Sequence, residues 1–205
     1  MKLCCVAVLV SILGGSLPGK SFAESRLAEA TARSTAGPSR VAAAPSAIWV
    51  NVPFAAQTKD GCGSASIAMV MQYWDKKQGK PVAAGAKSAV IQAALFSRAA
   101  DGIYASAMEK YFRDSGYQAF AFRGQWSDLE HHLSLGRPLI AAIEASGPMG
   151  PLHYVVVVGI DPERGYVYLN DPAQQKMLRI SREGFESEWR STHDWTLLAV
   201  PVAAH

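Results

Sequence analysis

Hydrophobic and polar positions repeat with two different periods along this chain, and the period changes near its middle. In the first half, apolar and polar residues alternate over 48–54, which predicts a short strand. Helical spacing then predicts a helix that begins at Cys62, an Ala-rich helix over 84–100 and a helix over 105–115. The first of these helices is apolar on nearly all sides from 65 to 74, which is typical of a helix in the centre of a domain.

Strand patterns dominate the second half. Apolar or β-branched runs bounded by Gly, Pro and Asp predict strands at 117–122, 138–143, 153–160, 165–170 and 195–200. Two helices are predicted between them, one with Ser127 as its N-cap and one over 182–190 with Ser181 as its N-cap. Because helices come first and strands afterwards, the pattern predicts an α+β domain with a mostly antiparallel sheet.

Residues 1–23 have the layout of a secretory signal peptide. A single lysine precedes an apolar run of about a dozen residues, and Ser21 and Ala23 are small, as a signal peptidase requires. The run is shorter than the roughly 20 residues that a spanning helix needs, which disfavours a membrane anchor. Cys4 and Cys5 precede the apolar run, so cleavage would remove them, and we expect a periplasmic or secreted protein without stable membrane insertion.

The next segment, 24–47, is rich in Ala, Ser, Arg and Pro and shows no strand alternation, which predicts a flexible linker. From residue 48 onward the sequence changes to a succession of apolar strand patterns and helical patterns. The remaining segment, 48–205, has the length of one domain with a single hydrophobic core.

Charge and composition exclude several classes of function. The whole chain has a formal charge of +3, and the predicted signal contains two lysines and no acidic residue, so the rest carries +1. No basic run is interleaved with aromatic residues, so a nucleic-acid partner is not expected. The histidines lack the spacing of a metal site and no glycine-rich phosphate loop precedes a helix, so the sequence predicts neither a metal nor a cofactor.

Cys62 is the one cysteine that would remain after cleavage of the signal. Its predicted position at a helix N-terminus favours the thiolate, because unpaired backbone N–H groups and the helix dipole stabilise negative charge there. A leftover exported cysteine can instead form an intermolecular disulfide, or it can be a small buried core residue. The choice depends on whether the chain supplies catalytic partners.

A cysteine nucleophile needs a histidine base and a third group that orients the histidine. His153 is the candidate base, since it opens a strand directly after the Gly-Pro-rich loop 146–151 and so stands at the rim of the sheet. Surface positions are expected for the other four histidines, His131, His132, His193 and His205.

The length of the predicted hairpin indicates which residue could orient the histidine. A turn over 161–165 would bring Asp171 to within about one to three residues of the position opposite His153. Its carboxylate could accept the Nδ1 proton of the imidazole, leaving Nε2 free to face the thiol. Asn170 could act in the same way less strongly, but its side chain should point to the opposite face of the strand.

Acyl chemistry also needs hydrogen-bond donors for an oxyanion. The backbone N–H of Cys62 is one candidate, and the side-chain amide of Gln57, five residues earlier in the chain, is another. Gly61 and Gly63 flank the cysteine and allow a substrate backbone to approach closely.

These residues together resemble those of a known family. The resemblance rests on Gln57, Cys62, His153 and Asp171 in this order, on the segment Val-Pro-Phe-Ala-Ala-Gln over 52–57, and on a strand that opens His-Tyr-Val-Val-Val-Val-Gly-Ile-Asp. Over most of residues 48–202 the chain is similar to the bacteriocin-processing cysteine peptidases, family thirty-nine of the papain-like clan.

The resemblance implies a papain-like α+β fold in which Cys62 is the nucleophile, His153 the general base, Asp171 the orienting carboxylate and Gln57 an oxyanion-hole residue. The best-known members are cytoplasmic domains fused to an exporting ATPase, and they cut leader peptides after a double glycine. This sequence instead carries a predicted export signal and has Ser64 where the family often has proline or leucine. We therefore draw no expectation of double-glycine cleavage from it.

The sequence thus predicts an exported thiol hydrolase that cleaves a peptide or related amide bond of a peptide or protein substrate. Two alternatives stay open. One is a peptide-binding module on the same fold that does not cleave, and the other is an acyl transferase or transpeptidase that uses the same residues. Sequence does not separate transfer from hydrolysis, because the shape of the cleft and its access to water choose the acceptor.

Overall fold

The computed structural model of the chain describes residues 47–144 and 152–203. The predicted signal peptide, all but the last residue of the predicted linker, the loop 146–151 and His205 lie outside the described residues. Within the described part, no helix is both long enough and apolar enough to cross a membrane.

The helices and strands of the described residues follow the order that the hydrophobic pattern predicts, with Leu178–Ser181 (β6) as an additional strand. The helices are α1 (Cys62–Lys77), the short 3₁₀ helix η1 (Ala84–Ala86), α2 (Ser88–Leu95), α3 (Ala105–Asp114), α4 (Trp126–Ser134) and α5 (Arg182–Arg190). The strands are β1 (Ile48–Trp49), β2 (Tyr117–Arg123), β3 (Leu139–Glu144), β4 (Leu152–Asp161), β5 (Tyr166–Asn170), β6 (Leu178–Ser181) and β7 (Trp195–Pro201).

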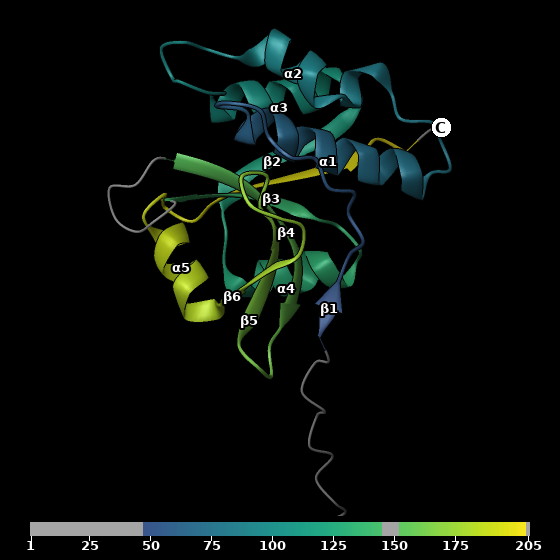
Figure 1. Cartoon of the computed structure of the whole chain (residues 1–205). Helices are drawn as coiled ribbons and strands as arrows, with labels where there is room; N and C mark the ends of the chain where they lie inside the picture. The colour runs from purple at the N-terminus through teal and green to yellow at the C-terminus, as the bar shows by residue number, and fades with distance from the viewer. Residues whose placement is uncertain (1–46, 145–151, 204–205) are drawn as a thin grey trace, which may run out of the picture. The chain divides into compact units, whose positions relative to one another are not determined.

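The described strands form one sheet in the order β2-β7-β3-β4-β5-β6, and β1 pairs with β4. Every pairing is antiparallel. The helices α1, α2 and α3 form a layer over one side of the sheet, whereas α4 and α5 lie below it in the view of Figure 1. The predicted α+β class with a mostly antiparallel sheet is confirmed.

Helix α1 is the central support of the domain, as its apolar sequence predicts. Nearly all of its residues from Gly63 to Trp74 are buried, with Gln72 as the exception. Two of its polar side chains bond to the sheet: Ser66 Oγ donates to the carbonyl of Tyr154 in β4 at 3.1 Å, and Trp74 Nε1 donates to the carbonyl of Ala199 in β7 at 2.9 Å. The N-terminus of α1 is thereby fixed over the beginning of β4.

Two predicted elements are shorter than the pattern suggests. The strand predicted over 48–54 is only the two residues of β1, because the backbone turns on itself where the Val52 N–H donates to the Val50 carbonyl. The helix predicted over 84–100 is interrupted at Lys87 and ends at Leu95, since Lys87 and Phe96 both have extended backbones. The spacing of alanines over 84–100 does not indicate where such a helix is interrupted or ends.

Other differences concern the ends of elements. Gln125, rather than Ser127, is the N-cap of α4, and it forms a reciprocal capping box with Asp128, whose carboxylate accepts the Gln125 N–H at 2.8 Å. Strand β6 was not predicted, because four residues are too few for a periodic signal. The predicted cap of α5 is present, since Ser181 Oγ accepts the Gly184 N–H at 3.1 Å.

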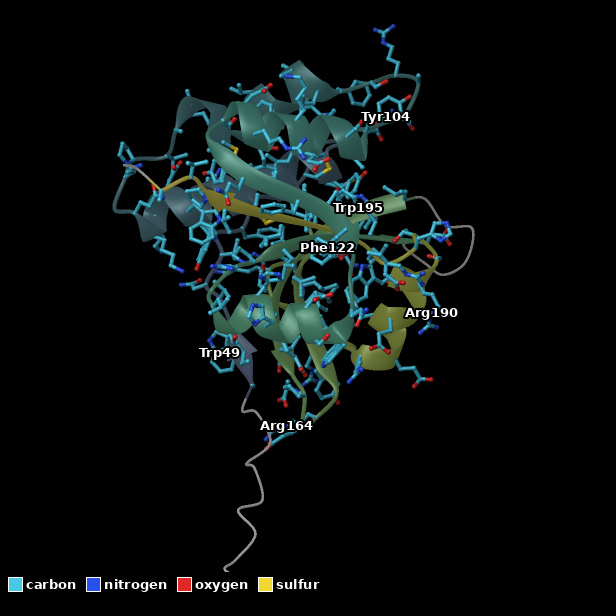
Figure 2. The ribbon with its side chains drawn as sticks, turned by 180° about the vertical axis from the view of Figure 1, so that it is seen from behind. Trp49, Tyr104, Phe122, Arg164, Arg190 and Trp195 are labelled. Atoms are coloured by element: carbon cyan, nitrogen blue, oxygen red, sulfur yellow. The ribbon has the colours of Figure 1, made fainter. Side chains whose placement is uncertain are left out.

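The β4–β5 hairpin contains a bulge. Val157 pairs with Leu169, but Gly159 pairs with Tyr168, so Val158 is an extra residue on β4. The Val158 carbonyl accepts the N–H of Val50 at 2.7 Å, which ties the bulge to the chain just after β1. At the tip of the hairpin, seen in Figure 2, Arg164 donates through its backbone and its guanidinium to the Asp161 carboxylate.

Gly159 is required where β1 crosses the bulge. A Cβ atom at this position would lie 2.8 Å from the Ile48 carbonyl oxygen and 2.9 Å from the Trp49 Cβ, whereas one at Gly102 would meet nothing nearer than 3.8 Å. We therefore expect Gly159→Ala to lower the free energy of unfolding by about 1–3 kcal/mol and Gly102→Ala to change it little. Urea denaturation of the two variants tests this, and equal stability would contradict it.

Candidate active site

Cys62 is the first residue of α1, with Gly61 as the N-cap. The chain enters the helix through a turn in which the Gly61 N–H donates to the Thr58 carbonyl at 3.0 Å. Asp60, just before the cap, has a positive φ of 56°. Cys62 is the one free cysteine of the described residues and is half-buried, so its thiol combines a helix N-terminus with access from outside.

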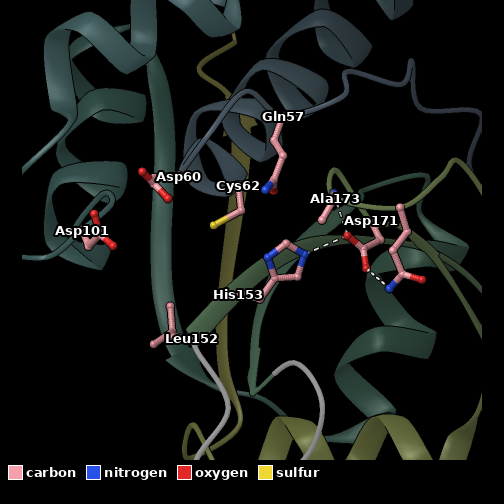
Figure 3. Close-up of a pocket in the computed structure, with 9 residues that line it drawn as sticks. Gln57, Asp60, Cys62, Asp101, Leu152, His153, Asp171 and Ala173 are labelled. Carbon is pink, nitrogen blue, oxygen red and sulfur yellow. Dashed lines mark hydrogen bonds and ion pairs between the residues drawn. The ribbon is translucent and has the colours of Figure 1, made fainter.

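His153 is the second residue of β4 and is 8% exposed. Its Nε2 and the Asp171 Oδ1 are 2.7 Å apart. Figure 3 shows the imidazole between Cys62 and Asp171, with its other ring nitrogen, Nδ1, on the side of the cysteine. The structure thus brings the three residues together in the expected order.

The two ring nitrogens have the opposite partners from those we expected. Nε2 faces Asp171 and Nδ1 faces the thiol. Cys62 lies on the Nδ1 side of the ring in Figure 3, whereas Asp171 directly follows the neighbouring strand β5 and meets Nε2 at the far end of the ring. With a proton on Nε2, the neutral ring presents Nδ1 to Cys62 as a base.

Register explains why Asp171 rather than Asn170 meets the histidine. Asn170 pairs with Val156, so Asp171 continues the ladder opposite Val155, two residues from His153 and on the same face. Without the extra residue in the bulge, the alternation would be shifted by one and Asn170 would occupy that face. Asn170 is instead fully buried, where its amide donates to the Val52 carbonyl and accepts the N–H of Met177.

Gln57 lies in the extended segment before α1. Its backbone N–H donates to the carbonyl of Pro172 at 2.9 Å, so the loop that carries it is attached directly beside Asp171. In Figure 3 its side chain descends next to Cys62. Its Oε1 is buried without a hydrogen-bond partner among the described residues.

Electrostatics favour an ion pair between the thiol and the imidazole. Burial acts to raise the pKa of Cys62, but hydrogen bonds with the His153 side chain and the Tyr154 backbone, together with the charge of His153, leave this pKa below its ordinary value. Burial acts to lower the pKa of His153, but hydrogen bonds with Asp171 and Cys62 raise it to about 9. The two pKa shifts are opposite in sign, and each favours the charged form of its group, the thiolate and the imidazolium.

The three residues open into a pocket of about 340 Å³. It is lined by Gln57, Asp60, Cys62, Asp101, Leu152, His153, Asp171, Ala173 and Gln174. Among these described residues there is no lysine or arginine, so the His153 imidazolium is the only lining cation available to balance the thiolate. The sequence contains no indication of Ala173 and Gln174, because Asp-Pro-Ala-Gln over 171–174 is typical of an ordinary turn, and no motif singled out Asp101.

The remaining described histidines do not reach this pocket. His131 and His132 lie on α4, with ring centroids 5.2 Å apart, and His193 follows α5. His131 and His193 are exposed, as expected, whereas His132 is half-buried, so only for His132 is the expectation of a surface position wrong in degree. Within the described residues, no group of three or more His, Cys, Asp or Glu side chains could bind a metal ion.

Comparison with known proteins gives one family and several similar structures. Residues 49–196 match the model of the Peptidase_C39 like family. A C39-like peptidase from Bacillus anthracis superposes with a TM-score of 0.62 at 18% identity, covering 78% of this chain and all of that one. A comparison with curated proteins finds no match.

Two further structures extend the likeness. A double glycine motif protease from an AMS/PCAT transporter, solved with its leader peptide, gives a TM-score of 0.54 at 26% identity over 75% of this chain and 94% of that one. A digestive procathepsin L of Tenebrio molitor gives 0.57 at 13% identity over 76% and 70%. The papain-like fold that the sequence resemblance implied is therefore confirmed.

The pKa shifts predict how fast the thiol reacts as the pH changes. An ordinary thiol is well under 1% thiolate at pH 6, whereas a thiol with a lowered pKa beside an imidazolium retains its charge there. With Cys4 and Cys5 replaced by Ser, we expect iodoacetamide to alkylate Cys62 at pH 6 at least about 10-fold faster than free cysteine.

The same chain with the additional change Cys62→Ala provides the background rate. Alkylation that falls with pH as steeply as that of free cysteine would show that the thiol is not activated.

Proposed function

Because the chain belongs to the Peptidase_C39 like family, it is a cysteine-type peptidase, and we propose that it is an exported member that cleaves peptide bonds through a Cys62, His153 and Asp171 triad. The observation that carries the assignment of the triad is the arrangement at one pocket of the Cys62 thiol, the His153 imidazole beside it and the Asp171 carboxylate bonded to the far side of the imidazole. Each of these groups matches a role in acyl transfer.

The chemistry begins from the thiolate and imidazolium pair. The Cys62 sulfur attacks the peptide carbonyl carbon, and the carbonyl oxygen becomes an oxyanion. The backbone N–H of Cys62 and the Gln57 side-chain amide are the donors proposed to stabilise it. Nδ1 of His153 then gives its proton to the leaving amine, and the C–N bond breaks to leave an acyl-enzyme.

Water completes the reaction. His153, now neutral, accepts a proton from water at Nδ1 as the hydroxyl attacks the thioester carbonyl. Collapse of the second tetrahedral intermediate releases the carboxylic acid product and restores the ion pair. Asp171 stays ionised throughout and orients the ring through Nε2, since its pKa is held below the ordinary value, with burial opposing and the bond to His153 outweighing it.

The pocket supports a peptide or protein substrate. It is open, lies over the thiol and contains the side-chain amide of Gln57, which an extended peptide could reach. One similar structure is that of a protease in complex with a leader peptide.

Substitution of the proposed catalytic residues should separate their roles. We expect Cys62→Ala and His153→Ala to abolish hydrolysis of a mixed pool of synthetic peptides followed by mass spectrometry. Gln57→Ala should lower kcat by about 10²- to 10³-fold because it removes one oxyanion donor. His131→Ala, which changes an exposed histidine on α4, is the matched control and should leave the rate unchanged.

A competing amine distinguishes the possible acceptors. If hydrolysis is the reaction, the products remain free carboxylic acids when hydroxylamine or glycine amide is added at low concentration. Products joined mainly to the amine would identify a transferase, and peptides that bind without any cleavage by the unaltered protein would contradict the proposal.

Export rests on the layout of residues 1–23, whose apolar run and small residues before Glu24 suit cleavage by a signal peptidase. We expect the protein from a secreting bacterial host to begin at Glu24, as read by N-terminal mass spectrometry of the periplasmic and extracellular fractions. A variant with Ala23→Arg should accumulate uncleaved. Recovery of the full-length unaltered chain in the cytoplasm would contradict export.

A further inference from the structure

We propose that Gln174 is a positioning residue for the reaction, and that its side-chain amide fixes the rotation of the Asp171 carboxylate so that one oxygen stays directed at His153. The inference deepens the proposed function and rests on the triad assigned there. Gln174 does not reach the thiol or the imidazole in any described contact, and it acts through Asp171.

The hydrogen bonds of Asp171 are divided unequally between its two oxygens. Oδ1 accepts from His153 Nε2 at 2.7 Å and from the backbone N–H of Ala173 at 2.9 Å. Oδ2 accepts from Gln174 Nε2 at 2.6 Å, and the described residues give this oxygen no other donor. Loss of that amide would leave one carboxylate oxygen without a protein partner and free to turn toward water.

The position of Gln174 contributes in a second way, because its side chain shields the Asp171 carboxylate from water. Asp171 is 3% exposed, whereas Gln174 is exposed and lines the pocket, so its side chain covers the carboxylate from the outside. The Asp171 carboxylate thus bonds to the imidazole through Oδ1 and to this amide through Oδ2. An amide that excludes water from Oδ2 keeps the attraction between Asp171 and His153 in a less polar environment, where it is stronger.

The charged groups around Asp171 make an uncharged donor the suitable choice at position 174. His153 faces it from β4, with Cys62 beyond, and Glu188 faces it from α5. The pKa of Glu188 is raised, first by burial and then by the charge of Asp171. A carboxylate at position 174 would repel Asp171 and favour its protonation. A cation at this position would compete with the imidazolium for Asp171. An amide donates a hydrogen bond to the carboxylate and has neither effect.

The matched control is the next residue in the chain. Gln175 is also an exposed glutamine, and its side chain has no described hydrogen bond with Asp171. Gln174→Ala and Gln175→Ala therefore remove the same side chain from adjacent positions of one loop. A role limited to the stability of the loop would affect both variants similarly and would leave the protonation of His153 alone.

Two measurements on the full chain test the proposal. In ¹⁵N-histidine NMR titrations, the unaltered protein should keep His153 protonated to about pH 9. Gln174→Ala should lower that midpoint by roughly 0.5–1 pH unit, because a less well oriented carboxylate stabilises the imidazolium less. In peptide hydrolysis, Gln174→Ala should lower kcat about 5- to 10-fold with KM changed less than about twofold, and Gln175→Ala should do neither.

Gln174→Glu gives a signature that a purely structural role would not. At pH 8 the new carboxylate has no proton to donate and repels Asp171, so kcat should fall. At pH 5 the two carboxylates can share a proton that restores the hydrogen bond. The kcat of this variant relative to the unaltered protein should therefore be several-fold higher at pH 5 than at pH 8.

The outcomes separate the two proposals. If His153 in the unaltered protein titrates in the ordinary range of histidine, the triad itself fails. If it titrates near pH 9 and Gln174→Ala behaves like Gln175→Ala in both measurements, the triad stands and the role of Gln174 is overturned. A constant kcat ratio for Gln174→Glu across this pH range would also overturn it.

Discussion

The bulged pairing of β4 with β5 is the constraint on which the active site depends. The extra residue at Val158 shifts the alternation of β4 by one position, and this shift places Asp171 on the same face as His153. The bulge is in turn fixed by the close crossing of β1, where Gly159 leaves room for the Ile48 backbone. This feature of the sheet therefore decides which side chain meets His153, the proposed base.

A second constraint joins the parts of the site that come from distant positions in the sequence. The segment before α1 is attached to the segment after β5 by the Asn170 amide on the Val52 carbonyl and by the Gln57 N–H on the Pro172 carbonyl. The first bond leaves Asn170 no freedom to compete for the histidine. The second places Gln57, the proposed oxyanion donor, beside the loop that carries Asp171, so the segments that carry Gln57, Cys62 and Asp171 are connected directly.

Charge compensation explains why these groups occur together. A half-buried thiolate is unfavourable by itself, as is a buried imidazolium or carboxylate. In this pocket each charge stabilises the next, and the described lining residues provide no other cation. The pKa of Cys62 falls and that of His153 rises because of the same contacts, after burial has been overcome in both. Removing one member would leave its neighbour with an uncompensated charge, which is why the members are expected to act as a unit.

The sequence by itself determined the class of the fold and the central buried helix and indicated the four proposed site residues, because hydrophobic period and hairpin length are local properties. The bulge at Val158 decided that Asp171 rather than Asn170 meets His153. The sequence did not determine which ring nitrogen of His153 meets Asp171, the N-cap Gln125, the break at Lys87 or the amide of Gln174. These depend on the twist and bulge of the sheet and on side chains that meet across loops. Only the tertiary structure decided them, because ring orientation and carboxylate rotation follow from distances between atoms that the order of residues does not contain.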